Sequence, residues 1–242
     1  MGNIWREIWG NRSIDMNILQ SKDEQKILLE LKRCNGFDVL EGGKYEGWID
    51  QYLQIKNDHF YRGYKQKNSI RSVYEVGCGC GANLYLFEKD GMQCGGIDYS
   101  EKLISYAKEV LCSADLVHDE AINLSVDTKY DVVFSNAVFH FFSDEKYALE
   151  VLAKMYEKAR YAVGIIDLRD KDKEEDFFNF RRKNMENYEE RYAGLTNLFY
   201  PKQFFLEFAS KQHADIKFTV SDVQGYWNND FAFNCYIYIR DK

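Results

Sequence analysis

The sequence predicts an α/β fold, in which a mostly parallel β-sheet carries helices on both faces. From residue 70 onward, short apolar segments alternate with amphipathic ones, as in the strand–helix–strand units of a parallel sheet. A loop with glycine at alternate positions follows the first apolar segment. Near the end, two apolar segments have no helix between them, which predicts an antiparallel hairpin. We therefore expect a doubly wound seven-stranded sheet, closed by a C-terminal hairpin and preceded by a helical cap.

Residues 1–69 are expected to form this N-terminal helical cap or lid. Ser21 and Glu24 have the spacing of a capping box, which predicts a helix start, and Gly36 is placed to end that helix. A second helix is expected from Tyr45, because its apolar residues recur with helical periodicity. Its many Trp and Tyr side chains suit either core packing or a lid over a pocket.

The remaining residues, 70–242, are expected to form one domain with seven strands and four helices. The predicted strands are Ser72–Val76, Cys94–Asp98, Ala114–His118, Tyr130–Ser135, Tyr161–Asp167, Ile216–Asp222 and Phe231–Arg240. The predicted helices run from the glycine loop to Lys89, from Ser100 to about Leu111, from Asp144 to Arg160, and from Pro201 to about Gln212.

Composition and charge narrow the functional classes. The chain has 242 residues and a formal net charge of −7, which argues against a nucleic-acid partner. No apolar run approaches the roughly 20 residues that span a bilayer, and the N-terminus lacks a signal-peptide pattern, so we expect a cytoplasmic protein without a membrane partner. The six cysteines lack C-x₂-C spacing, which predicts reduced, mostly buried thiols and no metal site.

The most informative segment is the glycine loop, Glu75-Val-Gly-Cys-Gly-Cys-Gly81. Glycines let a backbone approach a ligand closely, and the N-terminus of the following helix presents free N–H groups. A dinucleotide site has a similar loop, but its spacing is G-x-G-x-x-G. Here the spacing is G-x-G-x-G, which disfavours an NAD-dependent oxidoreductase, as does the C-terminal hairpin.

Four segments resemble motifs of the class I, Rossmann-like, S-adenosylmethionine-dependent methyltransferases. Glu75–Gly81 resembles their first motif, E/D-x-G-x-G-x-G, and Gly96–Ser100 resembles the second, in which an acid ends strand two. Glu120–Leu124 resembles the third, D-A-x-x-L, and Tyr130–Ser135 the fourth. The resemblance covers about residues 70–242. It implies the Rossmann-like fold, S-adenosylmethionine as cofactor and S-adenosylhomocysteine as product.

The resemblance also implies roles for individual residues. Glu75 and the loop glycines would hold the methionine end, Asp98 would accept hydrogen bonds from the ribose hydroxyls, and Glu120 with Ala121 would contact adenine. From the residues alone, Asp98 could instead cap the helix beginning near Ser100, and the adenine acid could be either Asp119 or Glu120. The complete predicted cofactor site is Glu75, Gly77, Gly79, Gly81, Asp98, Tyr99, Asp119, Glu120, Ala121 and Ser135.

The segment after the fourth strand bears on the acceptor. Amino-methyltransferases of this class that act on DNA or on protein glutamine carry a proline-containing tetrad here, whereas this chain has Ser135-Asn-Ala-Val138, which argues against adenine-N6 methylation. His140 follows, at the sheet edge where ligands bind in open α/β folds. It could be a general base, or it could pack over the cofactor as an aromatic ring, and both interpretations remain open.

The charged insertion at about 169–200 would form the acceptor lid in this class. Tyr192–Phe205 and Tyr226–Asn234 loosely resemble methyltransferases of bacterial capsule and surface-polysaccharide clusters. That resemblance implies a sugar, sugar-nucleotide or phosphate-bearing acceptor. We predict methyl transfer to an O or N atom of a small polar molecule, with a non-catalytic protein that kept the cofactor fold as an alternative. The oligomeric state is left open. The predicted acceptor-binding residues are Tyr192, Tyr200, Tyr226 and Asn234.

Overall fold

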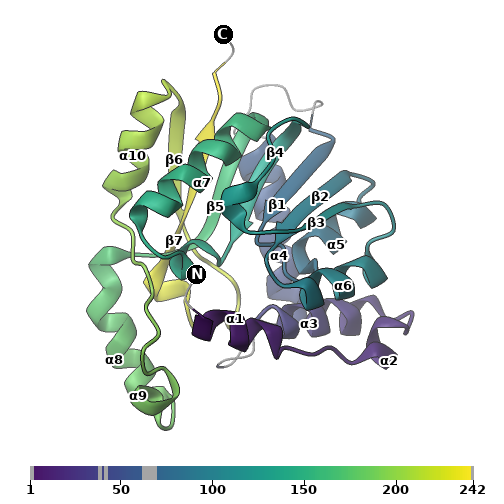
Figure 1. Ribbon diagram of the computed structural model, residues 1–242, viewed down its shortest axis with the longest axis vertical. Coiled ribbons are helices and arrows are strands. Elements are labelled where there is room, and N and C mark those ends of the chain that lie inside the picture. The colour runs from purple at the N-terminus through teal and green to yellow at the C-terminus, as the bar shows by residue number, and fades with distance from the viewer. Residues whose placement is uncertain (1–2, 38–39, 41–42, 62–69, 241–242) are drawn as a thin grey trace.

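The computed structural model describes residues 3–37, 40, 43–61 and 70–240, and its central feature is a seven-stranded sheet (Figure 1). The strand order is β3-β2-β1-β4-β5-β7-β6, and only β7 runs antiparallel to its neighbours, β5 and β6. The predicted fold class is confirmed. The strands are β1 (Ser72–Val76), β2 (Gln93–Asp98), β3 (Asp115–His118), β4 (Tyr130–Asn136), β5 (Ala159–Arg169), β6 (Asp215–Val220) and β7 (Ala232–Tyr238).

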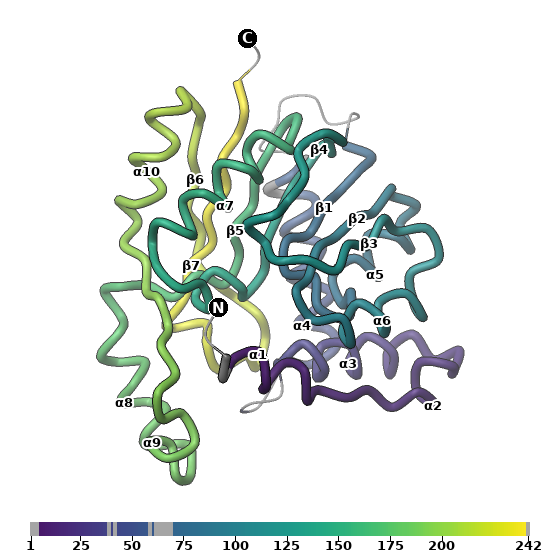
Figure 2. The backbone as a smooth tube through the Cα atoms, in the orientation of Figure 1, coloured from purple at the N-terminus to yellow at the C-terminus, as the bar shows by residue number. Residues whose placement is uncertain are grey.

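Helices cover both faces of the sheet, and an N-terminal group lies along one of its ends (Figures 1 and 2). Among the residues that the structure describes, no helix is long and apolar enough to cross a membrane. The α-helices are α1 (Asn3–Gly10), α2 (Met16–Leu19), α3 (Glu24–Cys34), α4 (Tyr45–Gln54), α5 (Ala82–Lys89), α6 (Glu101–Val110), α7 (Glu145–Lys158), α8 (Glu174–Asn184), α9 (Tyr188–Arg191) and α10 (Lys202–Lys211).

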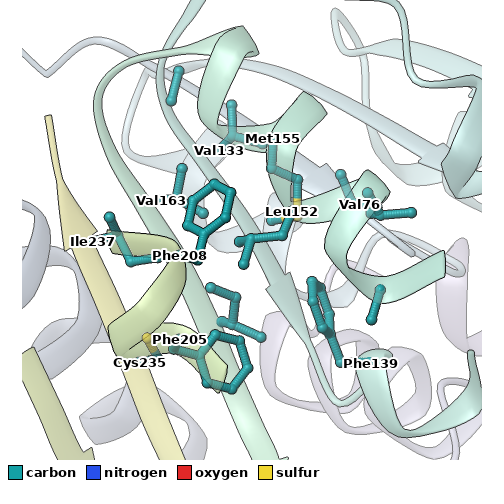
Figure 3. Close-up of a cluster of buried hydrophobic side chains, with 14 of the residues drawn as sticks. Val76, Val133, Phe139, Leu152, Met155, Val163, Phe205, Phe208, Cys235 and Ile237 are labelled. Atoms are coloured by element: carbon teal, nitrogen blue, oxygen red, sulfur yellow. The ribbon is translucent and has the colours of Figure 1, made fainter. Parts of the chain in front are cut away.

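The core lies on both faces of the sheet, because the central strands are buried on both sides. On one face, Val133 and Val163 of β4 and β5 pack with Leu152 of α7 and Phe205 of α10 (Figure 3). On the other face, side chains of β1 and β4 pack with α5, α6 and Phe60. Five of the six cysteines are buried and all are free, as the sequence predicted, and only Cys112 is exposed.

The start of α3 differs from the sequence prediction. Asp23, not Ser21, is its N-cap, and the Asp23 carboxylate accepts a hydrogen bond from the backbone N–H of Lys26 at 3.2 Å. The Ser21 hydroxyl instead accepts from the N–H of Asp23 at 3.3 Å, so the predicted capping box is wrong. The aspartate is the better cap here because its charge also suits the helix dipole. Gly36, with φ +87°, ends α3 as predicted.

An irregularity near the end of β5 shapes the site described below. The pairing register with β7 shifts between Ile165 and Leu168, and Asp167 between them has φ +58°. The side-chain oxygen of Asn234 on β7 accepts the N–H of Asp167 at 3.0 Å, which replaces the lost ladder bond. Such a bulge redirects the side chains around it, here those of Asp167 and Arg169.

Candidate functional site

Two adjoining pockets lie where the parallel strands β1, β2, β4 and β5 end, the edge at which open α/β sheets bind ligands. The glycine-loop pocket is lined by residues at the ends of β1, β2 and β4 and in the segments that follow these strands. The arginine pocket is named for Arg12, Arg169, Arg181 and Arg191, and its lining also includes residues of α1 and of the β6–β7 connection. The residues that line both pockets are Trp9, Asn35, Phe37, Ala137 and Phe141.

The glycine loop needs glycine for steric reasons. Gly77 and Gly79 both have positive φ, of +76° and +54°, and a side chain at either position would collide with Val138 or Asn35. Both therefore bring bare backbone to the pocket wall. Gly81 is the N-cap of α5, and its missing side chain makes room for Leu111. Gly81 is not among the residues that line the pocket.

Asp98 holds the loop from the neighbouring strand. Its carboxylate accepts the N–H of Gly79 at 2.8 Å and that of Ser100 at 2.9 Å. The N-cap of α6 is Ser100, whose hydroxyl accepts the N–H of Leu103, so the alternative that Asp98 is the helix cap is wrong. Asp98 lines the pocket, and burial raises its pKa to about 6. Each carboxylate oxygen has a second lone pair that can accept a ligand hydroxyl.

Glu75 is a buried carboxylate with one free oxygen. Its Oε1 accepts from the side-chain amide of Asn83 at 2.6 Å, whereas Oε2 is buried and has no hydrogen-bond partner among the described residues. Lys32 donates to the Asn83 oxygen at 2.8 Å. Burial raises the pKa of Glu75 and lowers that of Lys32, while their opposite charges counteract both shifts. A ligand ammonium group would satisfy the free oxygen.

Glu120, rather than Asp119, faces the pocket. Its carboxylate pairs with Arg6 of α1 and accepts from the Tyr147 hydroxyl at 3.4 Å. Asp119 does not line the pocket, because its carboxylate accepts the N–H of Glu120 and the amide of Asn123, both at 2.7 Å. Ala121 and Tyr99 also line the pocket.

Ser135 lies outside the glycine-loop pocket. It is fully buried, and its hydroxyl donates to the carbonyl of Val76 at 2.8 Å, which ties β4 to β1. The structure therefore places Gly81, Asp119 and Ser135 in supporting positions, away from the ligand surface. The predicted cofactor residues that it brings together around one cavity are Glu75, Gly77, Gly79, Asp98, Tyr99, Glu120 and Ala121.

His140 lines the arginine pocket and not the glycine-loop pocket. Its ring is buried, and Nδ1 has no hydrogen-bond partner among the described residues. Burial, together with the nearby cations of Arg169 and Arg181, holds the pKa of His140 well below its usual range. The imidazole is therefore neutral at physiological pH and can accept a proton or a hydrogen bond.

Two of the four predicted acceptor residues line this pocket, Tyr192 and Tyr226. The Tyr226 hydroxyl donates to the buried Asp167 carboxylate at 2.8 Å. Tyr200 is completely buried in the core and donates to the carbonyl of Phe139 at 2.8 Å. Asn234 supports the β5 bulge through its bonds to Asp167 and Val220. Neither Tyr200 nor Asn234 is among the residues that line the arginine pocket.

Other lining residues escaped the sequence analysis. Asp167 and Arg169 stand at the end of the fifth strand, a position that indicates the ligand edge of the sheet and was a usable signal. Arg181 and Trp9 lie in segments without a motif. Among the described residues, no group of three or more His, Cys, Asp or Glu side chains is placed to hold a metal ion.

Comparison with known proteins identifies the central part of the chain. Residues 73–160 match a family model described as a methyltransferase domain. This segment is a methyltransferase domain. It includes the glycine loop, Asp98 and Glu120, so the residues that surround the glycine-loop pocket come largely from the domain itself. The methyltransferase resemblance inferred from the sequence is confirmed.

Individual relatives agree with this assignment. Protein 235L of Invertebrate iridescent virus 6, which carries the name of a methyltransferase, is 35% identical over 88 residues, and the match covers 35% of this chain and 32% of that protein. The matched part thus spans about a third of the viral protein.

Solved structures share the overall fold of this chain. Magnesium protoporphyrin IX methyltransferase of Synechocystis PCC 6803, with bound S-adenosylhomocysteine, superposes with a TM-score of 0.62 at 12% identity, covering 98% of this chain and 99% of that one. The plantazolicin methyltransferase BamL, also with S-adenosylhomocysteine, gives 0.63 at 18% identity and covers 99% of each chain.

Proposed function

We propose that the protein is an S-adenosylmethionine-dependent methyltransferase acting on an O or N atom of a small polar acceptor. The observation that carries the proposal is the junction of the two pockets. A ligand in the glycine-loop pocket and a ligand in the arginine pocket would meet beside the five residues that line both. The bound donor supplies a methyl group on a positively charged sulfur, so the chain has mainly to align the reactants and exclude water.

The roles of the donor-side residues follow from their surroundings. The free Oε2 of Glu75 would accept from the methionine ammonium, and the backbone of Gly77 and Gly79 would line the methionine end. Asp98 would accept from the ribose hydroxyls with its remaining lone pairs. Glu120 would accept from the adenine amino group.

The N-terminal cap, residues 1–69, would act as a lid together with the insertion at 169–200. Helix α1 supports this proposal, because its Trp9 lines both pockets. The Trp5 indole donates to the carbonyl of Thr196 at 3.1 Å, and Arg6 pairs with Glu120. The lid would thus connect the acceptor-side insertion with the adenine end of the donor site.

On the acceptor side, His140 would be the general base and Tyr192 and Tyr226 would contact the acceptor. His140 and Asp167 are titratable groups lining the arginine pocket, which favours an enzyme over a non-catalytic binding protein. Following the sequence resemblance, we propose a sugar, sugar-nucleotide or phosphate-bearing precursor of capsule or surface polysaccharide as acceptor. We propose that the enzyme acts in the cytoplasm and has no nucleic-acid or membrane partner.

A methyl-transfer assay tests the proposal. The protein is incubated with S-adenosylmethionine carrying a labelled methyl group and a panel of sugar phosphates, nucleotide sugars and unphosphorylated sugars. Mass spectrometry should find the label in at least one product, and a Glu75→Gln variant should transfer it more slowly. Failure to bind the donor or its demethylated product would contradict the proposal.

A further inference from the structure

The charge of the arginine pocket is opposite to that of the whole chain. The chain carries a formal net charge of −7. The described lining of the arginine pocket nevertheless contains four cations and a single carboxylate, Asp167. The four cations are Arg12, Arg169, Arg181 and Arg191.

Arg169 is buried, with 6% of its surface exposed, and two of its nitrogens, Nε and Nη1, have no hydrogen-bond partner among the described residues. Its guanidinium carbon lies 4.5 Å from the centre of the Phe177 ring. The ring holds the guanidinium plane through a cation–π contact but cannot accept its in-plane N–H bonds. Buried donors without acceptors are unfavourable, so the free N–H groups indicate a missing ligand.

Arg181 approaches the same ring from α8. It is 3% exposed, and its guanidinium carbon lies 5.3 Å from the Phe177 ring centre and 4.2 Å from that of Tyr192. Its Nε donates to the sulfur of Met185 at 3.4 Å, which is a weak acceptor. Two arginines that share one ring are close enough to repel each other. Burial, and after it repulsion from Arg181, lowers the pKa of Arg169, while the Asp167 carboxylate counteracts the shift.

One carboxylate, that of Asp167, offsets only part of the charge of this pair. No ion pair to Arg169 or Arg181 is formed within the described part of the chain. Asp167, the acidic residue of the lining, attracts Arg169 without forming a salt bridge, and its oxygens accept from the Tyr226 hydroxyl at 2.8 Å and from the Asn228 amide at 2.7 Å. The two buried guanidinium groups therefore carry more positive charge than the single Asp167 carboxylate offsets, which favours binding of an anion.

We propose that Arg169 and Arg181 bind a phosphate group of the acceptor. This inference rests on the proposed function, because it names the substrate class of the same site. Guanidinium groups present paired N–H donors that match the oxygens of phosphate. Phosphate is favoured over carboxylate because a dianion balances both arginines. The phosphate would lie in the arginine pocket, with the nucleophilic atom directed toward the residues shared with the glycine-loop pocket.

The test is a titration of the protein with inorganic phosphate. Binding is measured by calorimetry and by the fluorescence of the tryptophans that line the pocket. The wild type should bind phosphate. Arg169→Met and Arg181→Met should each weaken binding by at least about tenfold, the loss expected for hydrogen bonds to a charged group. The matched control is Arg182→Met, since Arg182 is next in the chain, exposed and paired with Glu189. It should bind like the wild type.

A second anion and further variants show whether the pocket selects phosphate. Acetate should bind more weakly than phosphate, and equal or tighter binding of acetate would overturn the assignment to phosphate. Absence of phosphate binding by the wild type, or equal losses in Arg182→Met and Arg181→Met, would also overturn it. If Arg169→Met does not fold, Arg169→Lys takes its place. This variant keeps the charge but removes the paired donors, so its phosphate affinity should fall below that of the wild type by less than the affinity of Arg181→Met does.

S-adenosylhomocysteine binding is measured on the same samples. If phosphate binds as expected and S-adenosylhomocysteine does not, the proposed methyl transfer fails while the anion site stands. If S-adenosylhomocysteine binds and phosphate does not, only the anion site fails.

Discussion

The carboxylate of Asp98 accepts the backbone N–H of Gly79 at 2.8 Å. This bond joins the end of β2 to the loop after β1, so two motifs that are separate in the sequence become one wall of the glycine-loop pocket. The same carboxylate is the group proposed to hold the ribose. Asp98 therefore links the shape of the loop to recognition of the ligand.

The first prediction is that Asp98→Ala weakens S-adenosylhomocysteine binding by at least about tenfold, because hydrogen bonds to a charged group contribute roughly 1.5–3 kcal/mol. Asp119→Ala is the matched control, since that carboxylate bonds only locally and does not line the pocket. Calorimetry measures both affinities. An unchanged affinity of Asp98→Ala together with a lower melting temperature would assign Asp98 a purely structural role.

The second prediction concerns pH. Burial raises the pKa of Asp98 to about 6. The ionised carboxylate accepts hydrogen bonds from hydroxyls better than the acid does, so cofactor affinity should be constant well above this pKa and should decline as the pH falls through about 6. Asp98→Asn should lack this decline. An identical pH profile in wild type and Asp98→Asn would exclude Asp98 as its source.

The third prediction separates the two ends of the donor. Glu75→Gln removes the charge facing the methionine ammonium while keeping the side-chain shape, so S-adenosylhomocysteine should bind more weakly. Methylthioadenosine, which lacks the amino-acid portion, should bind the variant and the wild type equally. Comparable losses for both ligands would mean that Glu75 shapes the loop and does not contact the ammonium.

The fourth prediction concerns His140. His140→Ala should keep cofactor affinity and lose turnover by about 10²-fold or more, as for a general base. Because its pKa lies well below 6.5, the wild-type rate should be flat above 6.5 and should fall at lower pH, where the imidazole becomes protonated. His140→Phe keeps the ring and removes the nitrogens. An active Phe variant without the acidic decline would leave His140 only a packing role.

The sequence predicted the strands and the glycine loop because their signals are local. The segment Ser72–Val76, in which Val73, Tyr74 and Val76 are apolar, and the glycines after it are sufficient to predict a buried strand and a close-approach loop, and both are present. Tyr200 shows the opposite case. A tyrosine near a lid has the same sequence signature whether its hydroxyl meets a ligand or, as here, the Phe139 carbonyl in the core.

The arginine pocket could be predicted only in part, for a related reason. Arg169 and Arg181 meet on the ring of Phe177, and this meeting depends on how α8 folds back against the end of β5. The bulge at Asp167 depends on Asn234 of a strand far along the chain. The local pattern of apolar residues does not indicate such long-range contacts. The sequence therefore predicted only some of the residues that line the arginine pocket.

The most direct test is calorimetric titration of the purified protein with S-adenosylhomocysteine and, separately, with NAD. The two adjoining pockets, the glycine spacing and the free oxygen of Glu75 predict that S-adenosylhomocysteine binds and that NAD does not. Tight binding of NAD, with no response to S-adenosylmethionine or S-adenosylhomocysteine, would contradict the assignment of a methyltransferase.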